Sequence, residues 1–164
     1  MTKTLDKKIF TDHILENQNI IHKICNVYCF DQEDRKDLYQ EIILQLYKSF
    51  SKFRHESGLN TWMYRVALNT AITMTKKQKK YNTIHDNTHD LDILHDEQHQ
   101  NEDIELLYKA IHQLNKIDRA IILLWLEEKS YQEISDITGL TVKNISVKLV
   151  RIKNNLSEMI TKIQ

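Results

Sequence analysis

The chain has 164 residues, of which 41% are hydrophobic, and its 23 basic and 23 acidic side chains cancel to a formal net charge of zero. A chain of this length buries one moderate core or two small ones. Two glycines and no proline remove the residues on which tight hairpins rely, while the abundant leucine, isoleucine, lysine and glutamate favour helix. We therefore expect an all-α fold. The neutral net charge does not by itself point to a polyanion partner, so the distribution of charge along the chain is more informative than its sum.

Residues 3–30 carry apolar side chains mainly at three- and four-residue steps, which predicts one or two amphipathic helices. No long apolar segment follows the basic start, and no later window approaches the roughly 20 apolar residues that span a bilayer. Cys25 and Cys29 are too few for a disulfide framework and share one helical face with His22. A tetrahedral metal site would need a fourth ligand, so we expect these side chains to pack in the core and to bind no metal. Because two cysteines cannot form a disulfide framework, we also expect a reducing, cytoplasmic setting.

Two further helices follow in the first half of the chain. Asp31 is placed to cap the first of them, whose apolar stripe repeats every four residues from Leu38 to Phe50. After the loop HESGLN, Thr61 is placed to cap the next helix, TWMYRVALNTAITM. Basic side chains greatly outnumber acidic ones between positions 48 and 80, and they end in the lysine cluster TKKQKK. This part of the chain is a basic block.

The segment after this block has the opposite charge. Residues 82–105 contain five aspartates, three glutamates and no lysine or arginine, a composition that repels itself and buries little apolar surface. We expect a flexible acidic linker over 82–103, between a first domain at 1–81 and a second at 104–164. Its histidines have no rigid spacing, so we expect them to stay solvated and bind no metal. These histidines are His85, His89, His95 and His99.

The second half predicts an apolar helix over about 104–114, another from Ala120, and then two helices joined by a tight turn. Ser130 and Glu133 have the spacing of a capping box at the start of a short helix, Tyr131 to Thr138. Gly139 is suited to end that helix in the left-handed conformation, and Thr141 is placed to cap the next one. This order predicts a helix-turn-helix.

The last helix has an apolar face and a basic face. Its apolar residues recur at three- and four-residue steps and are expected to face inward. These are Val142, Ile145, Leu149, Ile152 and Leu156. The other side predicts contacts with duplex DNA, although a solvated basic helix of a bundle has the same local pattern. The expected DNA-binding residues are Thr141, Lys143, Asn144, Ser146, Lys148, Arg151 and Lys153.

Two groups of segments resemble a known family. DLYQEIILQLYKSFSKF and TWMYRVALNTAI, followed by the lysine cluster, resemble conserved region 2 of RNA polymerase sigma factors. LNKIDRAIILLWLEEKSYQEISDITGLTVKNISVKLVRIKNNL resembles their region 4. The order is that of the sigma-70 family, and the lack of a middle domain between the two regions points to its extracytoplasmic-function (ECF) group.

The resemblance implies a cytoplasmic initiation factor and no enzyme. Such a protein binds core RNA polymerase, places region 4 on the duplex −35 element and opens promoter DNA at the −10 element, where it captures a single strand. An anti-sigma factor is a further implied partner, and neither a cofactor nor a small-molecule substrate is expected.

The resemblance also implies roles for individual residues. The polymerase contact would fall on Asp37, Leu38, Gln40, Glu41 and Leu44. Recognition of the −10 element would fall on Arg54, Asn60, Thr61, Trp62, Arg65 and Asn69, with phosphate contacts from Lys76, Lys77, Lys79 and Lys80. A tryptophan just inside a helix is usually a packing residue, so the ring of Trp62 is the weaker DNA candidate. Residues 143–148 depart from the family's usual recognition helix, so no base preference transfers.

Two other functions stay open. The first is a helix-turn-helix regulator that binds duplex DNA without polymerase, and the second is a helical adaptor with no DNA role. The residues that resemble region 2 would have no role in either the regulator or the adaptor. No catalytic triad, phosphate-binding loop or pair of catalytic carboxylates stands out, which argues against an enzyme.

Overall fold

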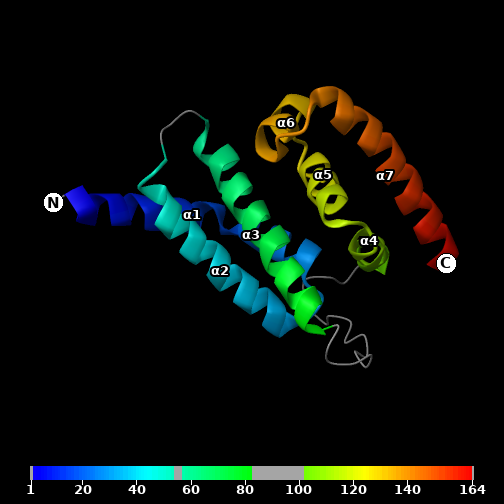
Figure 1. The fold of residues 1–164 in the computed structure, drawn as a ribbon, viewed down its shortest axis with the longest axis horizontal. Helices are drawn as coiled ribbons and strands as arrows, with labels where there is room; N and C mark the ends of the chain where they lie inside the picture. The colour runs from blue at the N-terminus through cyan, green and yellow to red at the C-terminus, as the bar shows by residue number, and fades with distance from the viewer. Residues whose placement is uncertain (1, 54–56, 83–101, 164) are drawn as a thin grey trace.

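The computed structural model describes residues 2–53, 57–82 and 102–163, and within these ranges it consists of seven helices and no strand (Figure 1). The helices are α1 (Thr2–Tyr28), α2 (Gln32–Phe50), α3 (Leu59–Asn82), α4 (Glu102–His112), α5 (Lys116–Leu126), α6 (Tyr131–Thr138) and α7 (Val142–Ile163). The predicted all-α fold is confirmed for these ranges. Arg54 and most of the expected acidic linker, with His85, His89, His95 and His99, lie outside the described residues.

Helices α1, α2 and α3 form a first unit, in which α2 and α3 run side by side (Figure 1). The predicted stripe of α2 is largely buried at Leu38, Ile42 and Leu46. Helix α3 presents small side chains to this core, since Ala67 and Ala71 are fully buried, and small residues let helix axes approach closely. The segment expected to form one or two helices is a single run, α1, interrupted at Asn17 by a non-helical backbone (φ −119°, ψ 17°).

Two of the expected helix caps differ from the sequence prediction. Asp31 stands at the N-cap of α2 with an extended backbone (φ −80°, ψ 140°), but its side chain makes no capping hydrogen bond. Thr61 is not a cap at all, because α3 already begins at Leu59. The Gly58 carbonyl accepts a hydrogen bond from the Trp62 N–H at 3.1 Å, which places Thr61 inside the first turn.

Helices α4 to α7 form a second unit, and its local signals are confirmed. The Glu133 N–H donates to Ser130 Oγ (3.1 Å) and the Ser130 N–H donates to Glu133 Oε2 (2.7 Å), which completes the capping box. Hydrogen bonding from Ser130 to the carboxylate, first of all from the Ser130 backbone N–H, holds the pKa of Glu133 below its usual value. Gly139 adopts the left-handed conformation (φ 78°), and Thr141 Oγ1 accepts the Asn144 N–H at 3.2 Å. Helices α6 and α7 therefore form the predicted helix-turn-helix.

Helix α7 packs on α4, α5 and α6 through most of its predicted apolar face. Ile145, Leu149, Ile152 and Leu156 are buried, whereas Val142 is 39% exposed. The prediction that Val142 faces the core is wrong, because it is the first residue of α7 and the buried face begins one turn later.

The two units pack against each other through α4, α5 and α6 of the second unit, and α5 is the most apolar of the three. Five consecutive residues, Ala120 to Leu124, are buried, and at about 100° per residue they point in all directions around the helix. Helix α5 contacts α6 and α7 of its own unit and α1 and α3 of the first unit, so it lies between them (Figure 1). Within the described ranges, no helix has the length and apolar content needed to cross a bilayer.

A pair of neighbouring residues in α7 tests this packing. Leu149 is 0% exposed and Val150 is 60% exposed. Leu149→Ala should lower the free energy of unfolding by about 2–5 kcal/mol, because it leaves a cavity under the helix. The measurement is urea unfolding followed by circular dichroism.

Val150→Ala is the matched control and should change the free energy of unfolding by less than about 0.5 kcal/mol. Equal losses in the two variants would mean that α7 does not pack on the second unit through the face described.

Candidate nucleic-acid interface

The exposed face of α7 carries several of the predicted DNA-binding residues. Lys143, Asn144 and Arg151 are exposed, and Ser146 is half-buried. Thr141 is exposed just before the helix, where its hydroxyl oxygen accepts the Asn144 N–H. Two cations and one amide are thus presented on the side of α7 away from its buried face, a combination suited to phosphates and base edges.

The other two predicted lysines of α7 are held by α5. Lys148 Nζ lies 3.9 Å from Asp118 Oδ1, and its side chain is only 27% exposed. Lys153 Nζ lies 4.5 Å from the centre of the Trp125 ring, a cation–π contact. Asp118 is itself fixed by Asn115, whose side-chain amide donates to Asp118 Oδ2 at 2.9 Å. Both lysines therefore lie on the flanks of α7, where Lys153 is exposed, as the sequence pattern predicted, and Lys148 is half-buried.

The candidate −10 residues lie at the start of α3. Asn60 and Asn69 are exposed, and Thr61, Trp62 and Arg65 are half-buried. Trp62, Arg65 and Asn69 follow one another by three and four residues, so they share one face of the helix.

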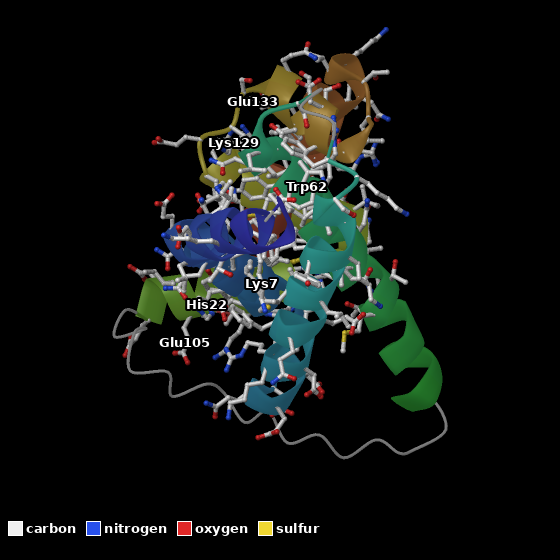
Figure 2. The ribbon with its side chains drawn as sticks, turned by 90° about the vertical axis from the view of Figure 1, so that its left-hand side faces the viewer. Lys7, His22, Trp62, Glu105, Lys129 and Glu133 are labelled. Atoms are coloured by element: carbon white, nitrogen blue, oxygen red, sulfur yellow. The ribbon has the colours of Figure 1, made fainter. Side chains whose placement is uncertain are left out.

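Trp62 belongs to an aromatic cluster at the end of α2. Its ring centre lies 6.1 Å from that of Phe50 and 5.3 Å from that of Phe53, and Phe50 in turn contacts Phe10. The ring is therefore a packing residue that remains partly exposed. Figure 2 shows Trp62 below Lys129 and Glu133 in the upper half of the view, with Glu105 of α4 in the lower half.

The remaining basic residues of the first unit are described only in part. The backbone of α3 stays helical to Asn82 and therefore includes the positions of Lys76, Lys77, Lys79 and Lys80. Their side chains and the whole of Arg54 lie outside the described residues.

Arg65 joins the candidate −10 surface to the helix-turn-helix. Its Nε donates to the main-chain oxygen of Asp136 in α6 at 2.7 Å. Beside it, Lys129 Nζ lies 5.4 Å from the centre of the Tyr64 ring. The start of α3 and the second unit are therefore in direct contact.

Further polar contacts extend this interface between the units along α1. Tyr28 Oη donates to the carbonyl of Lys116 at 2.6 Å, and Lys23 Nζ pairs with Glu127 Oε1 at 2.7 Å. The sequence reasoning singled out none of these residues. The sequence did contain one signal for this interface, the uninterrupted apolar run of α5. A helix that is covered on one side only would carry polar residues on its other side.

His112 is the buried polar residue of the same interface. It is 7% exposed, its ring stacks on Phe30 with centres 3.6 Å apart, and Nε2 lies 2.9 Å from the carbonyl oxygen of Asn26. Because a carbonyl only accepts, Nε2 must carry the proton, and Nδ1 is left without a hydrogen bond. Burial, and then the positive charge of Arg119, lower the pKa of His112 to about 4, so the ring is neutral.

The candidate polymerase-binding edge lies on α2. Asp37 and Gln40 are exposed, Leu44 is 44% exposed, and Glu41 accepts a hydrogen bond from Gln45 Nε2 at 2.9 Å. Leu38 is only 1% exposed. Its prediction as an interface residue is corrected: it packs in the core of the first unit and supports the edge from beneath.

Cys25 and Cys29 are buried free thiols, as the core-packing interpretation predicted. Burial raises the pKa of each thiol to about 12. Within the part of the chain that the structure describes, no three histidine, cysteine or acidic side chains are grouped so that they could hold a metal ion.

Residues 13–81 match the family Sigma-70 region 2, and residues 104–156 match the family Sigma-70, region 4. The RNA polymerase sigma factor SigV of Bacillus subtilis (strain 168) is 28% identical over 98% of this chain and 94% of its own length. The ECF RNA polymerase sigma-E factor of Haemophilus influenzae is also 28% identical, over 94% of this chain and 89% of its own length.

Two solved structures share the fold. The sigma factor RpoE from Bartonella quintana, in complex with the anti-sigma factor NepR, has a TM-score of 0.79 at 20% identity and covers 94% of this chain and 98% of its own. CnrH in complex with the cytosolic domain of CnrY has a TM-score of 0.68 at 13% identity and covers 96% of this chain and 91% of its own. In both cases the similarity spans both units.

The neutral state of His112 predicts a pH dependence. Its pKa falls from 6.5 in the unfolded chain to about 4 in the folded chain. Between these values the unfolded chain binds a proton that the folded chain does not, so this contribution to stability is complete above pH 6.5 and decreases as the pH falls toward 4. The loss should reach about 3 kcal/mol, measured by urea unfolding at a series of pH values.

His112→Phe keeps an aromatic ring beside Phe30 and removes the titrating group, so the free energy of unfolding of this variant should fall less between pH 6.5 and pH 4 than that of the wild type. His22→Phe is the control, since His22 is an exposed histidine of α1, stacked on Tyr39. A His112→Phe variant with the full wild-type slope would contradict the assignment.

Proposed function

Because the chain belongs to the sigma-70 family of RNA polymerase sigma factors, in its extracytoplasmic-function group, we propose that α2, α3 and α7 carry its three contacts with the transcription machinery. As a sigma factor it binds core RNA polymerase, directs it to promoter DNA and catalyses no reaction itself. The observation that carries this function is the presence of region 2 and region 4 in family order, each on its own helical unit. Its place of action is the cytoplasm, where polymerase and promoters are found.

The polymerase contact is the exposed edge of α2. Asp37, Gln40 and Glu41 supply polar and acidic groups, and Leu44 adds an apolar side chain beside them. An apolar anchor surrounded by polar groups is the usual composition of an interface hot spot. Leu38 contributes indirectly, by holding α2 in place.

The −10 contact is the start of α3. A flipped base needs a stacking or polar pocket next to positive charge. Asn60, Thr61 and Asn69 offer hydrogen-bonding groups, Arg65 offers the charge, and the ring of Trp62 is partly exposed above its aromatic cluster. Arg54 precedes this surface in the chain, and the lysines of the last turns of α3 are assigned to duplex phosphates.

The −35 contact is the exposed face of α7. Lys143 and Asn144 lie in its first turn, where recognition helices reach base edges, and Arg151 lies two turns further along. Lys148 and Lys153 contribute charge from the flanks, and Thr141 and Ser146 contribute hydroxyl groups.

The two DNA contacts require the units to separate. The −35 and −10 elements are roughly 25 base pairs apart, which at 3.4 Å per base pair is roughly 85 Å. In the structure Arg65 donates to the main chain of Asp136 in α6, within the helix-turn-helix itself. Residues 83–101, between α3 and α4, would then act as a tether, and their fully extended length of roughly 65 Å suits that role.

An anti-sigma factor is the third proposed partner. Both solved structures of similar fold are described as complexes, the first with the anti-sigma factor NepR and the second with the cytosolic domain of CnrY. Their similarity to this chain spans both units, which supports the arrangement found here as the one that such a partner would hold.

Run-off transcription with purified core polymerase and a promoter library tests the function. Addition of the chain should produce specific transcripts that core polymerase alone does not make.

Leu44→Asp should lower the affinity for core polymerase by about 30-fold and reduce transcription in parallel, because it puts a charge at the proposed hot spot.

Leu15→Asp is the matched control, since Leu15 of α1 is 60% exposed and lies outside the α2 edge. It should leave polymerase affinity within about twofold. Transcripts that appear without the chain would contradict the sigma function, and tight duplex binding without polymerase would favour an independent regulator. Equal losses from Leu15→Asp and Leu44→Asp would contradict the assignment of the α2 edge.

The salt dependence of −35 binding tests the role of Arg151. Removing one phosphate contact should reduce the slope of log K against log salt concentration by about 0.9. Arg151→Ala should show this change when the assembled holoenzyme is titrated with a −35 duplex. Lys162→Ala, in the exposed last turn of α7, should keep the wild-type slope.

A further inference from the structure

Two exposed valines stand on the face of α7 that the core does not use. Val147 is 54% exposed and Val150 is 60% exposed, whereas Ile145 and Leu149 are 0% exposed. At about 100° per residue, Val147 lies about 200° around the helix from Ile145, on the side opposite the buried face. It is therefore among the residues of α7 farthest from the protein interior.

The neighbours of Val147 on this face are cations. Lys143 precedes it by four residues and Arg151 follows it by four, so the three side chains lie one above another on the outer surface. A β-branched apolar residue at such a position contributes nothing to the core and has a lower helix propensity than alanine or lysine. The packing of the fold does not account for it.

The chemistry of the DNA major groove does account for an exposed apolar side chain at position 147. Thymine is the one base that presents a methyl group there, and apolar side chains recognise thymine through that group. The flanking cations would hold the helix against the phosphates and bring Val147 to the base edges. From this juxtaposition we propose that Val147 reads the methyl group of a thymine in the −35 element, a step that rests on the proposed −35 role of α7.

Val147 is favoured over Val150 by its place along the helix. Recognition helices contact base edges with their N-terminal residues, and Val147 is the sixth residue of α7, which starts at Val142. Val150 lies almost one turn further along, about 4.5 Å deeper into the C-terminal part of the helix. It therefore provides a control of the same residue type and similar exposure.

The test replaces thymine by uracil, which removes only the methyl group. Holoenzyme assembled with core polymerase selects its −35 sequence from a duplex library, and each selected thymine is then changed to uracil in turn. At one position uracil should weaken wild-type binding about fourfold, the effect of one methyl group left unburied. With Val147→Ala the same replacement should have almost no effect, and with Val150→Ala the wild-type sensitivity should remain.

Several results would overturn the proposal. These are a selected −35 element without thymine, intact −35 binding that is insensitive to uracil, sensitivity that persists in Val147→Ala, or sensitivity lost only in Val150→Ala. If Val147 instead lies against a protein surface, Val147→Ala would weaken assembly with polymerase and leave the uracil effect unchanged, which also overturns it. Failure of wild-type holoenzyme to bind any −35 duplex would instead contradict the proposed function.

Discussion

From Ala120 to Leu124, helix α5 is apolar around its whole circumference, and such a stretch is stable in water only when other elements cover it on every side. Its own unit covers it in part, through α6 and α7, and α1 and α3 of the first unit complete the burial. The composition of this one 11-residue helix therefore favours the contact between the two units. If the units separate on a promoter, the apolar surface of α5 that faces the first unit would be exposed to water. Contact with polymerase would bury it again.

Two of the polar contacts between the units follow the same rule. The last carbonyl groups of a helix have no partner within it. Asn26 lies in the last turn of α1 and Asp136 in the last turn of α6, and their carbonyl oxygens accept hydrogen bonds from His112 and Arg65 of the opposite unit. The cation of Arg65 also suits the negative end of the α6 dipole. Each unit therefore satisfies a helix end of the other, and Arg65 is engaged in this way whenever the units are together.

Sequence reasoning succeeded where the deciding contacts are local. The capping box of Ser130 and Glu133, the left-handed Gly139 and the cap at Thr141 involve residues three or four positions apart, so their pattern was sufficient to predict them. It failed at Thr61 and at the side chain of Asp31, because threonine and aspartate suit many positions near a helix start. Val142 shows a related error, since periodicity identifies the apolar side of a helix but does not say where along that side the core begins.

The sequence by itself determined the helices, their order, the helix-turn-helix and the family, because these depend on residue type, spacing and order along the chain. Only the tertiary structure decided which candidate side chains are available. It buries Leu38, turns Lys148 toward Asp118 and Lys153 toward Trp125, and joins Arg65 to Asp136. The physical reason is that the period of a helix assigns a side chain to a face, whereas its exposure depends on which distant element covers that face.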